Sequence, residues 1–448
     1  MKMKGVSQIS HERMSTHSNE DSERLKALTD QPHAPILRNC SGHHLQKNEQ
    51  YELEYFTREE LVKPISAKKN ENCWLENFID YCFSEVPFYR HYFDKSSPLE
   101  EIPTISRVDL STDITSFIPD QLPTKRIIAY ETSGTTGHPL IVPSHPVVAG
   151  KYSAYHKKAL AWNCVNIDDF NSDLAIMLAG YQEKCFTYAS VLPYLNNKGL
   201  LKLNFHPSDW RHPDDRQIYI DHNAPDLISG DPISLCELAK IPFTHQPKAI
   251  LTTSMTLLSG CEHKLHKRFG CPVIDLYSLN EVGPVGCSVP NKKGFKLLQS
   301  ELYVEILDSY GSPVELGQRG EITVTGGFNH YLPLLRYRTG DFGRLEPDGD
   351  DWFIQDLEGR PPVQFKTVND VWLNNVDITH LLQKFSLSQF SLHQHTDGKL
   401  TVRILPAANA KQLISVLSKK FGFPVEVQII KHANSANKVI QYTSDLSV

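Results

Sequence analysis

The chain has 448 residues, a length that favours two or three folding units over one compact domain. Hydrophobic residues make up 40% and charged residues 22%, as in globular proteins, and the formal net charge is -6. This charge provides no basic footprint for nucleic acid, no apolar run is long enough to span a membrane, and the polar start does not resemble a signal peptide. We therefore expect a cytoplasmic multidomain protein that binds neither nucleic acid nor membranes.

The nine cysteines are odd in number and never spaced as Cys-x-x-Cys. This pattern argues against both a disulfide framework and a zinc knuckle. We expect reduced, mostly buried thiols.

The predicted elements begin after a polar start. Residues 1–50 lack apolar periodicity and are expected to form a mobile tail or a loosely docked arm. A helical pattern follows from about residue 52, and one predicted helix ends before Pro87. Its core-facing residues recur at helical spacing: Trp74, Phe78, Tyr81 and Cys82.

The middle of the chain alternates short apolar runs with longer mixed segments. Such alternation is typical of an α/β fold with a largely parallel sheet. The predicted strands are 126–130, 173–177, 227–229, 249–252 and 272–276. Two further strands, 342–346 and 352–355, flank a turn at 347–350 and predict an antiparallel hairpin.

The last part of the chain predicts a small α+β unit. It contains a helix over 410–421 and strands at 390–394, 400–404 and 425–430. Pro361 and Pro362 can continue neither a helix nor a ladder and mark the boundary. The predicted domains are thus a tail or arm (1–50), a large domain (51–360) and a small domain (361–448).

A segment rich in glycine and hydroxyl side chains, Tyr130-Glu-Thr-Ser-Gly-Thr-Thr-Gly-His-Pro139, follows the first strand-like run of the middle part. Glycines allow close backbone approach, consecutive N–H groups form an anion nest, and the hydroxyls add donors. The segment therefore suits a polyphosphate, although a plain Gly/Ser/Thr turn is the alternative. It is not a Walker A loop.

A second block, Asp275-Leu-Tyr-Ser-Leu-Asn-Glu281-Val-Gly283, follows an apolar strand. An aromatic ring at a strand end can flank a purine, and a carboxylate a few residues later can hold Mg²⁺ on phosphate oxygens. The alternative places Tyr277 in the core and Glu281 in the first turn of a helix.

The third block, Tyr331-Leu-Pro-Leu-Leu-Arg-Tyr-Arg-Thr-Gly-Asp341, ends in an aspartate. At the mouth of a strand, Asp341 can accept both ribose hydroxyls of a nucleotide. Arg336 and Arg338 are expected to tie the loop to the core. An ordinary turn aspartate is the alternative for Asp341.

In this order, the three blocks resemble the motifs of the acyl-adenylate-forming superfamily, in its phenylacetate-CoA ligase-like and CapK-like branch. The third block is similar to the family's Pro-Leu-Ile-Arg-Tyr-Arg-Thr-Gly-Asp almost residue for residue. The resemblance covers about residues 85 to 440. It implies a large N-terminal domain of layered sheets and helices, a small mobile C-terminal α+β domain, and an active site between them.

The resemblance also assigns roles to individual residues. It implies that Glu281 holds Mg²⁺ and that Lys438 swings into the site as the catalytic lysine, assisted by Thr136. The implied ATP-binding residues are Thr132, Ser133, Gly134, Thr135, Thr136, Gly137, Asp275, Tyr277, Asp341 and Arg360.

Several positions depart from the family pattern. His138 stands where the family has Lys, Ser278 and Asn437 stand where it has Gly, and Met255 replaces Glu. Pro361-Pro362 occupies the place of the hinge, where it fixes φ and stiffens the link between the domains. These departures indicate a divergent member of the family.

The acid-binding pocket is expected near residues 178–186 and 224–234, the second of which resembles the family's substrate-binding segment. The candidate lining residues are Tyr181, Phe186, Gly230 and Ser254. Tyr181 and Phe186 suit a flat aromatic acid, although aromatic residues more often belong to the core.

The resemblance implies that the chain activates a carboxylic acid with ATP to an acyl-adenylate, releases pyrophosphate and transfers the acyl group to coenzyme A. One alternative is transfer to an amine or to the thiol of an acyl carrier protein. Another is a catalytically inactive nucleotide-binding regulatory protein. Either a monomer or a homodimer is expected. His263 and His266 have no obvious further ligand pair to complete a metal site.

Overall fold

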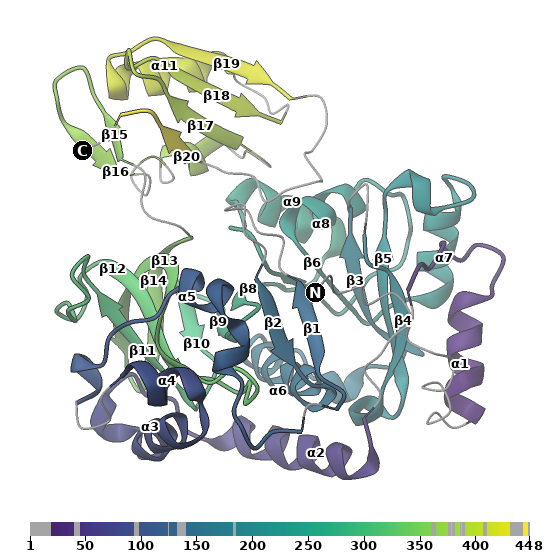
Figure 1. The fold of residues 1–448 in the computed structure, drawn as a ribbon. Helices are drawn as coiled ribbons and strands as arrows, with labels where there is room; N and C mark the ends of the chain where they lie inside the picture. Colours follow the sequence, from purple (N-terminus) through teal and green to yellow (C-terminus); the bar gives the residue numbers. More distant parts are fainter. Residues whose placement is uncertain are drawn as a thin grey trace.

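The computed structural model describes residues 19–39, 45–93, 98–123, 125–131, 140–181, 185–359, 364–374, 378, 381–385, 387, 390–405, 410–430 and 442–446. Residues 132–139, which contain the predicted phosphate loop, lie outside the described residues, as do Arg360 to Pro362 and Lys438. Their roles stay predictions. A large N-terminal body carries a smaller C-terminal unit at one end (Figure 1).

The chain begins with helices that pack on the large domain: α1 (Asn19–Thr29), α2 (Lys47–Val62), α3 (Trp74–Glu85), α4 (Pro87–Tyr92) and α5 (Arg107–Thr112). Helix α3 confirms the predicted apolar face, since Trp74 and Phe78 pack against the core that contains Cys82. Pro87 lies in the first turn of α4, where its missing N–H costs no helical hydrogen bond.

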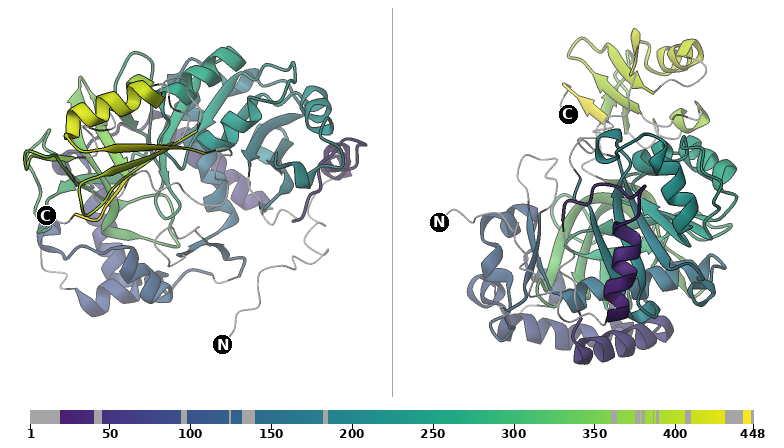
Figure 2. Two further views of the ribbon diagram at one scale, coloured as in Figure 1. Left: turned by 90° about the horizontal axis from the view of Figure 1, so that it is seen from above. Right: turned by 90° about the vertical axis from the view of Figure 1, so that its right-hand side faces the viewer.

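The described part of the predicted N-terminal tail is docked to the large domain. Leu28 is buried and joins the core behind the parallel sheet. The guanidinium of Arg24 donates to the carbonyl oxygen of Asn197 at 2.5 Å, and the Ile36 N–H donates to the carbonyl oxygen of Asp209 at 2.8 Å. Helix α1 lies beside β4 and β5 (Figure 2). Residues 19–39 are therefore docked on the large domain.

A twelve-stranded sheet in the order β11-β12-β13-β14-β10-β9-β8-β7-β6-β3-β5-β4 forms the centre of the large domain. One half contains β3 (Leu174–Gly180), β4 (Tyr188–Leu192), β5 (Lys198–Asn204), β6 (Leu227–Gly230), β7 (Ala249–Thr252) and β8 (Val273–Leu279). The other half contains β9 (Gly283–Cys287), β10 (Phe295–Leu297), β11 (Leu302–Leu307), β12 (Gly320–Gly326), β13 (Leu334–Asp348) and β14 (Asp351–Gly359).

The half from β3 to β8 is largely parallel, and helices cover both of its faces. Neighbouring residues of one strand point to opposite cores: Ile228 packs in one apolar cluster and Leu227 in another. Strands buried on both faces are therefore apolar without alternation, which confirms the predicted α/β layering. The covering helices are α6 (Pro146–Trp162), α7 (Asp215–Asn223), α8 (Pro232–Leu238) and α9 (Ser259–Phe269).

A separate two-stranded ribbon brackets the predicted phosphate loop. It consists of β1 (Ile128–Glu131) and β2 (Ile141–Ser144), which pair antiparallel with Glu131 opposite Ile141. The side chain of Asn329 donates to the carbonyl oxygen of Pro143 at 3.0 Å. The ribbon is thereby fixed to the segment that leads into β13.

The C-terminal unit has the predicted α+β order. It contains β15 (Gln364–Lys366), β16 (Trp372–Asn374), β17 (Phe390–Gln394), β18 (Leu400–Ile404), α11 (Ala410–Phe421), β19 (Val425–Ile429) and β20 (Tyr442–Ser444). Four of these strands form a sheet in the order β19-β18-β17-β20. Leu413 and Leu417 of α11 pack on one face of this sheet against Val402. Within the described residues, no helix has the length and apolar composition needed to cross a membrane.

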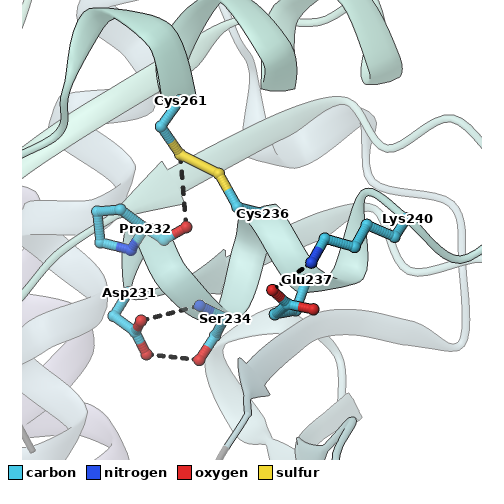
Figure 3. The surroundings of a disulfide bond; sticks show 7 residues. All are labelled: Asp231, Pro232, Ser234, Cys236, Glu237, Lys240 and Cys261. Carbon is cyan, nitrogen blue, oxygen red and sulfur yellow. Dashed lines mark hydrogen bonds and ion pairs between the residues drawn. A yellow bond between two sulfur atoms is a disulfide. The ribbon is translucent and has the colours of Figure 1, made fainter. Parts of the chain in front are cut away.

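The prediction that the cysteines are reduced thiols is wrong for one pair. Cys236 of α8 and Cys261 of α9 form a disulfide that joins two helices on the same face of the parallel sheet (Figure 3). The two cysteines are 25 residues apart, so no local spacing could reveal the pair. The described cysteines outside this bond are free: Cys73, Cys82, Cys164, Cys185, Cys271 and Cys287.

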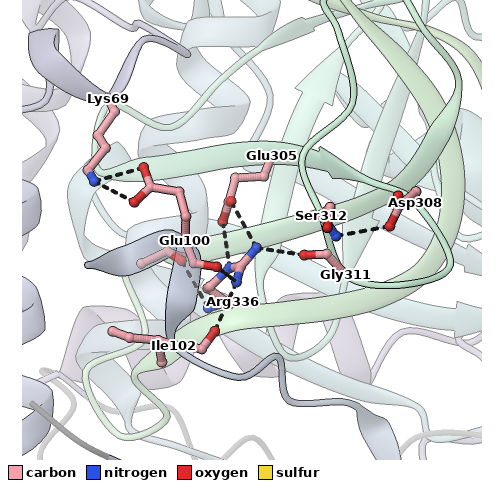
Figure 4. Close-up of polar contacts among 9 residues, drawn as sticks. Lys69, Glu100, Ile102, Glu305, Asp308, Gly311, Ser312 and Arg336 are labelled. Atoms are coloured by element: carbon pink, nitrogen blue, oxygen red, sulfur yellow. Dashed lines mark hydrogen bonds and ion pairs between the residues drawn. The ribbon is translucent and has the colours of Figure 1, made fainter. Parts of the chain in front are cut away.

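Arg336 ties the third block to the core, as predicted. Its buried guanidinium donates to the Glu305 carboxylate at 3.3 Å and to the carbonyl oxygens of Glu100, Ile102 and Gly311 at 2.6, 2.9 and 3.1 Å (Figure 4). The planar guanidinium of an arginine carries five N–H donors and can donate to several acceptors at once, whereas the ammonium of a lysine has only three donors.

We expect Arg336→Lys to lower the free energy of unfolding by about 2 to 4 kcal/mol, because it leaves buried carbonyl groups and the Glu305 carboxylate with fewer partners. Urea unfolding measures this loss. Arg90→Lys is the control, because Arg90 pairs with Asp120 at the exposed surface and should change stability by less than about 1 kcal/mol. Equal losses in the two variants would contradict a special role for the buried guanidinium.

Candidate functional site

The candidate site lies where the large sheet changes from parallel to antiparallel. The first half of β8 pairs parallel with β7 up to Asp275, and its second half, from Leu276, pairs antiparallel with β9. In α/β proteins, ligands bind beyond the carboxyl ends of parallel strands where the strand order changes. Tyr277 and Glu281 follow this change directly along the chain.

Tyr277 and Asp341, taken from two different motifs, contact each other. The Tyr277 hydroxyl donates to Oδ2 of Asp341 at 2.8 Å, and the Asp341 N–H donates to Oγ1 of Thr339 at 3.1 Å. Burial, together with the nearby Asp341 charge, holds the pKa of Tyr277 well above its usual range. Its ring belongs to the apolar core, as the alternative interpretation of Tyr277 as a core residue predicts. Even so, its hydroxyl reaches the predicted ribose-binding residue.

Glu281 lies in the turn between β8 and β9, so the alternative in which it begins a helix is wrong. Its carboxylate is 4% exposed and accepts a hydrogen bond of 2.6 Å from the Tyr337 hydroxyl. The guanidinium of Arg107, in the first turn of α5, is 3.8 Å away. Burial and the Glu281 charge hold the pKa of Tyr337 well above its usual range.

Gly283 allows this turn to form. Its φ is +84°, in the region that favours glycine, and a Cβ there would lie 2.1 Å from the ring of Phe328. Any other residue would therefore displace either the turn that holds Glu281 or the ring below it.

The two phenol–carboxylate hydrogen bonds join β8 and its turn to β13. These strands are not neighbours, because β14, β10 and β9 lie between them. In a flat sheet, four strand spacings would separate β8 from β13 by about 19 Å. The 2.8 Å contact between Tyr277 and Asp341 therefore requires this half of the sheet to curl strongly. Curling brings the second and third motifs into one site.

The first motif has only its flanks within the described residues. Leu140, directly after the loop, belongs to the same apolar cluster as Tyr277 and Tyr337. Because β1 and β2 pair with Glu131 opposite Ile141, both ends of the loop are fixed by the ribbon. The described flank at Leu140 therefore packs in the core that also contains residues of the second and third motifs.

Asp275 connects β8 to the end of β7. Its carboxylate accepts a hydrogen bond from the Thr252 hydroxyl at 2.7 Å, and its backbone N–H donates to the Ser288 hydroxyl at 2.8 Å. Burial raises the pKa of Asp275 to about 7, against the lowering effect of the Thr252 hydrogen bond. A carboxyl group that titrates near neutral pH thus lies at the base of the candidate site.

Three of the four predicted pocket residues lie near the carboxyl ends of adjacent parallel strands. Gly230 ends β6, Tyr181 follows β3, and Ser254 follows β7 with a φ of +74°. At Gly230 a Cβ would lie 2.7 Å from the carbonyl oxygen of Ala179, so the backbones approach closely there.

Phe186, the fourth predicted pocket residue, is 53% exposed, and its ring packs 5.6 Å from that of Tyr188. The Tyr181 ring lies 5.6 Å from that of His206. The structure thus gathers Tyr181, Gly230 and Ser254 at one sheet edge, with Phe186 at the surface before β4.

Three further residues belong to the site but were not predicted from the sequence: Tyr337, Thr339 and Arg107. Tyr337 and Thr339 stand inside the third motif, so an alternation argument along that strand could have found them. Arg107 precedes every motif, and no sequence signal points to it. Arg338, as predicted, is bound to the core, with its Nε donating to the Glu321 carboxylate at 2.6 Å.

The pKa of Asp275 predicts a stability that falls as pH rises. Its folded-state pKa of about 7 exceeds the unfolded value of about 3.9, so the folded protein keeps a proton that the unfolded chain releases. Relative to Asp275→Asn, the parent protein should lose on the order of 1 kcal/mol per pH unit between about pH 5 and 7. Urea unfolding of both proteins across this range measures the difference, with the exposed Asp350→Asn as a control expected to follow the parent. Parallel curves for Asp275→Asn and the parent would contradict the shift.

Comparison with known proteins shows local sequence similarity to ligases, and no family model matches the chain. The phenylacetate-coenzyme A ligase of Pseudomonas putida is 33% identical over 87 residues, which cover 18% of this chain and 20% of that protein. The enzyme of the same name from Escherichia coli (strain K12) is 32% identical over 88 residues, 19% of this chain and 20% of that protein. The chain therefore matches about a fifth of the length of these relatives.

Solved structures match over most of the chain. A 2-hydroxyisobutyryl-CoA ligase in the postadenylation state, in complex with R3-HIB-AMP, matches with a TM-score of 0.65 and 15% identity, covering 87% of this chain and 92% of that one. The same ligase in an open conformation with 2-HIB-AMP and CoA matches with a TM-score of 0.55 and 16% identity, covering 83% and 90%. At these identities the likeness is one of fold.

The chain thus has the fold of these acyl-CoA ligases and, over a short stretch, sequence similarity to phenylacetate-coenzyme A ligases.

Proposed function

We propose that this protein activates a carboxylic acid with ATP to an acyl-adenylate and then transfers the acyl group to coenzyme A. The observation that carries the proposal is the pair of hydrogen bonds, Tyr277 to Asp341 and Tyr337 to Glu281, that joins two motifs far apart in sequence. Two phenols and two carboxylates from the second and third motifs meet at the switch point of an α/β sheet, where nucleotides bind.

Asp341 is the proposed ribose-binding residue. It lies at the point where β13 pairs with the end of β14, opposite Gly359, which directly precedes Arg360. A carboxylate at this position can accept hydrogen bonds from ribose hydroxyls, as acidic residues do in other nucleotide sites. Arg360, the next residue of the chain, is proposed to add a planar donor fork for the nucleotide.

Glu281 is the proposed magnesium ligand. Carboxylate oxygens are the protein ligands that Mg²⁺ prefers, and a bound Mg²⁺ ion neutralises negative charge on phosphate oxygens. The Tyr337 hydrogen bond orients this carboxylate, and the Arg107 guanidinium at 3.8 Å offsets part of its charge.

In the first proposed step, a carboxylate oxygen of the acid attacks the α-phosphorus of ATP, and the bond to the leaving pyrophosphate breaks. Lys438 and the hydroxyls of Thr135 and Thr136 are proposed to offset the charge that develops on the phosphate oxygens. In the second step, the thiol sulfur of coenzyme A attacks the acyl carbon, the carbon–oxygen bond to AMP breaks, and the thiol loses its proton.

The proposed acid is aromatic. Tyr181 lies at the carboxyl edge of the parallel strands, with Phe186 at the nearby surface, and flat rings suit an aromatic partner. The curated relatives named above are ligases of phenylacetate, an aromatic acid. A solved neighbour acts on a branched hydroxy acid, so aliphatic acids belong in the same assay.

The catalytic role of Lys438 predicts loss of pyrophosphate exchange. Acid-dependent exchange of labelled pyrophosphate into ATP, measured over aryl, arylacetic, fatty and amino acids, should identify the best substrate. Lys438→Ala should then lower exchange with that substrate by about 100-fold or more, because a charge that stabilises the transition state is lost. Lys419→Ala removes an exposed lysine of the same domain and should leave exchange unchanged. Equal exchange in both variants would remove Lys438 from the mechanism.

Glu281 can be tested with a variant that preserves its hydrogen bond. Glu281→Gln keeps an oxygen that accepts from the Tyr337 hydroxyl but removes the charge that binds Mg²⁺, so exchange should fall by about 100-fold. Tyr337→Phe keeps the charge and removes the hydrogen bond, so its loss of exchange should be smaller, with the main effect on stability, about 1 to 2 kcal/mol. A larger loss of exchange in Tyr337→Phe than in Glu281→Gln would argue against the metal-binding role.

The acceptor of the acyl group can be identified by measuring AMP release with the best acid, with and without coenzyme A. A strong increase on adding coenzyme A, together with formation of the acyl-CoA, is the expected result. If only an amine or an acyl carrier protein increased AMP release, that compound and not coenzyme A would be the acceptor. Nucleotide binding without exchange for any acid would instead favour an inactive regulatory protein.

A further inference from the structure

The outer face of the C-terminal sheet carries a cluster that the proposed ligase reaction does not use. It consists of His393 on β17, His395 just beyond that strand, and Asp445 just after β20. One potential ligand atom from each residue lies within 4.8 Å of those of the other two. None of these three residues belongs to the three motifs of the candidate site.

The strand pattern explains why the two histidines share a face. Phe390, Leu392 and Gln394 are buried, so the alternate positions of β17 point away from the core. Strand β20 lies beside β17 in parallel register, with Gln394 opposite Ser444, and Asp445 follows directly. The fold thus brings a carboxylate from the chain end next to a His-x-His pair.

The distances suit a metal ion of small radius. Nε2 of His393 lies 3.2 Å from Oδ2 of Asp445. Two ligands bound to tetrahedral zinc at its usual bond lengths lie about 3.3 Å apart, which is nearly this separation. One ring nitrogen of His395 lies within 4.8 Å of a ring nitrogen of His393 and of a carboxylate oxygen of Asp445, so a modest side-chain rotation completes a three-ligand set.

A threonine hydroxyl orients each imidazole. Thr443 Oγ1 lies 2.8 Å from Nδ1 of His393, and Thr401 Oγ1 lies 2.8 Å from Nε2 of His395. Metal-binding histidines are regularly held in this way, with one ring nitrogen in a hydrogen bond while the other binds the ion. The two threonines come from the two strands that flank β17.

The neighbouring cations of this face are directed to other partners. Lys399 pairs with Glu426 at 2.7 Å, and Arg403 donates to the side chain of Gln428 at 3.1 Å. These contacts hold the two positive charges on the β18–β19 side of the sheet, whereas Asp445 lies on the β20 side. The carboxylate of Asp445 therefore supplies negative charge next to the imidazoles.

We propose that His393, His395 and Asp445 bind a divalent transition-metal ion, with zinc as the physiological candidate and water as the remaining ligand. Two imidazoles and one carboxylate favour zinc and its neighbours over Mg²⁺, which prefers oxygen ligands. The ion links β17 to the end of β20. Asp445 follows Lys438 by seven residues, so the ion anchors the strand that succeeds the segment with the proposed catalytic lysine.

Competition titration of the tag-free, full-length protein with zinc and a chromogenic chelator tests this site. The parent protein should bind one zinc ion per chain at this site, and His393→Ala/His395→Ala should weaken that binding by about 100-fold, with a smaller loss in Asp445→Asn. His263→Ala/His266→Ala removes two imidazoles from α9 and should leave the binding unchanged.

Thermal unfolding provides a second measurement and checks that the variants fold. Without metal, the His393→Ala/His395→Ala variant should melt within about one or two degrees of the parent, because the side chains it truncates lie on the outer face. Zinc should raise the melting temperature of the parent but not of this variant. Equal zinc affinity in the parent and this variant, or an equal loss in the α9 control, would overturn the proposal. Because zinc binding is measured without ATP or acid, its failure would leave the ligase proposal untouched.

Discussion

Two hydrogen bonds between phenols and carboxylates hold the candidate site together. Tyr277 and Glu281 belong to β8 and its turn, whereas Asp341 and Tyr337 belong to β13, four places away in the sheet. The bonds form only because the sheet curls, and in turn they stabilise that curl. Burial places the Glu281 carboxylate in surroundings of low polarity, where it needs its hydrogen bond.

The same arrangement explains why the proposed reaction requires cations. Glu281 presents negative charge at the place where the phosphates of ATP are proposed to bind, and Asp341 presents it at the proposed ribose site. Like charges so close repel one another strongly when water is excluded. Mg²⁺ on Glu281 and the ammonium of Lys438 are the groups proposed to offset this repulsion, and the nearby guanidinium of Arg107 contributes from α5.

Much of the fold and part of the site were accessible from local sequence patterns. The apolar runs predicted the parallel strands, and the C-terminal strands and helix followed the predicted order, because period and turn signals are local. The contacts of Arg107 and Tyr337 with Glu281 depend on the curl of the sheet, which no window of residues encodes. The Cys236–Cys261 bond and the His393–Asp445 contact also join distant segments, and both became apparent only from the packing of helices and strands.

A crystal structure of the protein with an acyl-adenylate analogue tests the central claim most directly. The account predicts both ribose hydroxyls within hydrogen-bonding distance of the Asp341 carboxylate, the adenine beside Tyr277, and the phosphate facing residues 132–137. A nucleotide bound elsewhere, with the Tyr277–Asp341 and Tyr337–Glu281 pairs intact and distant from it, would contradict the claim that these motifs form an adenylation site.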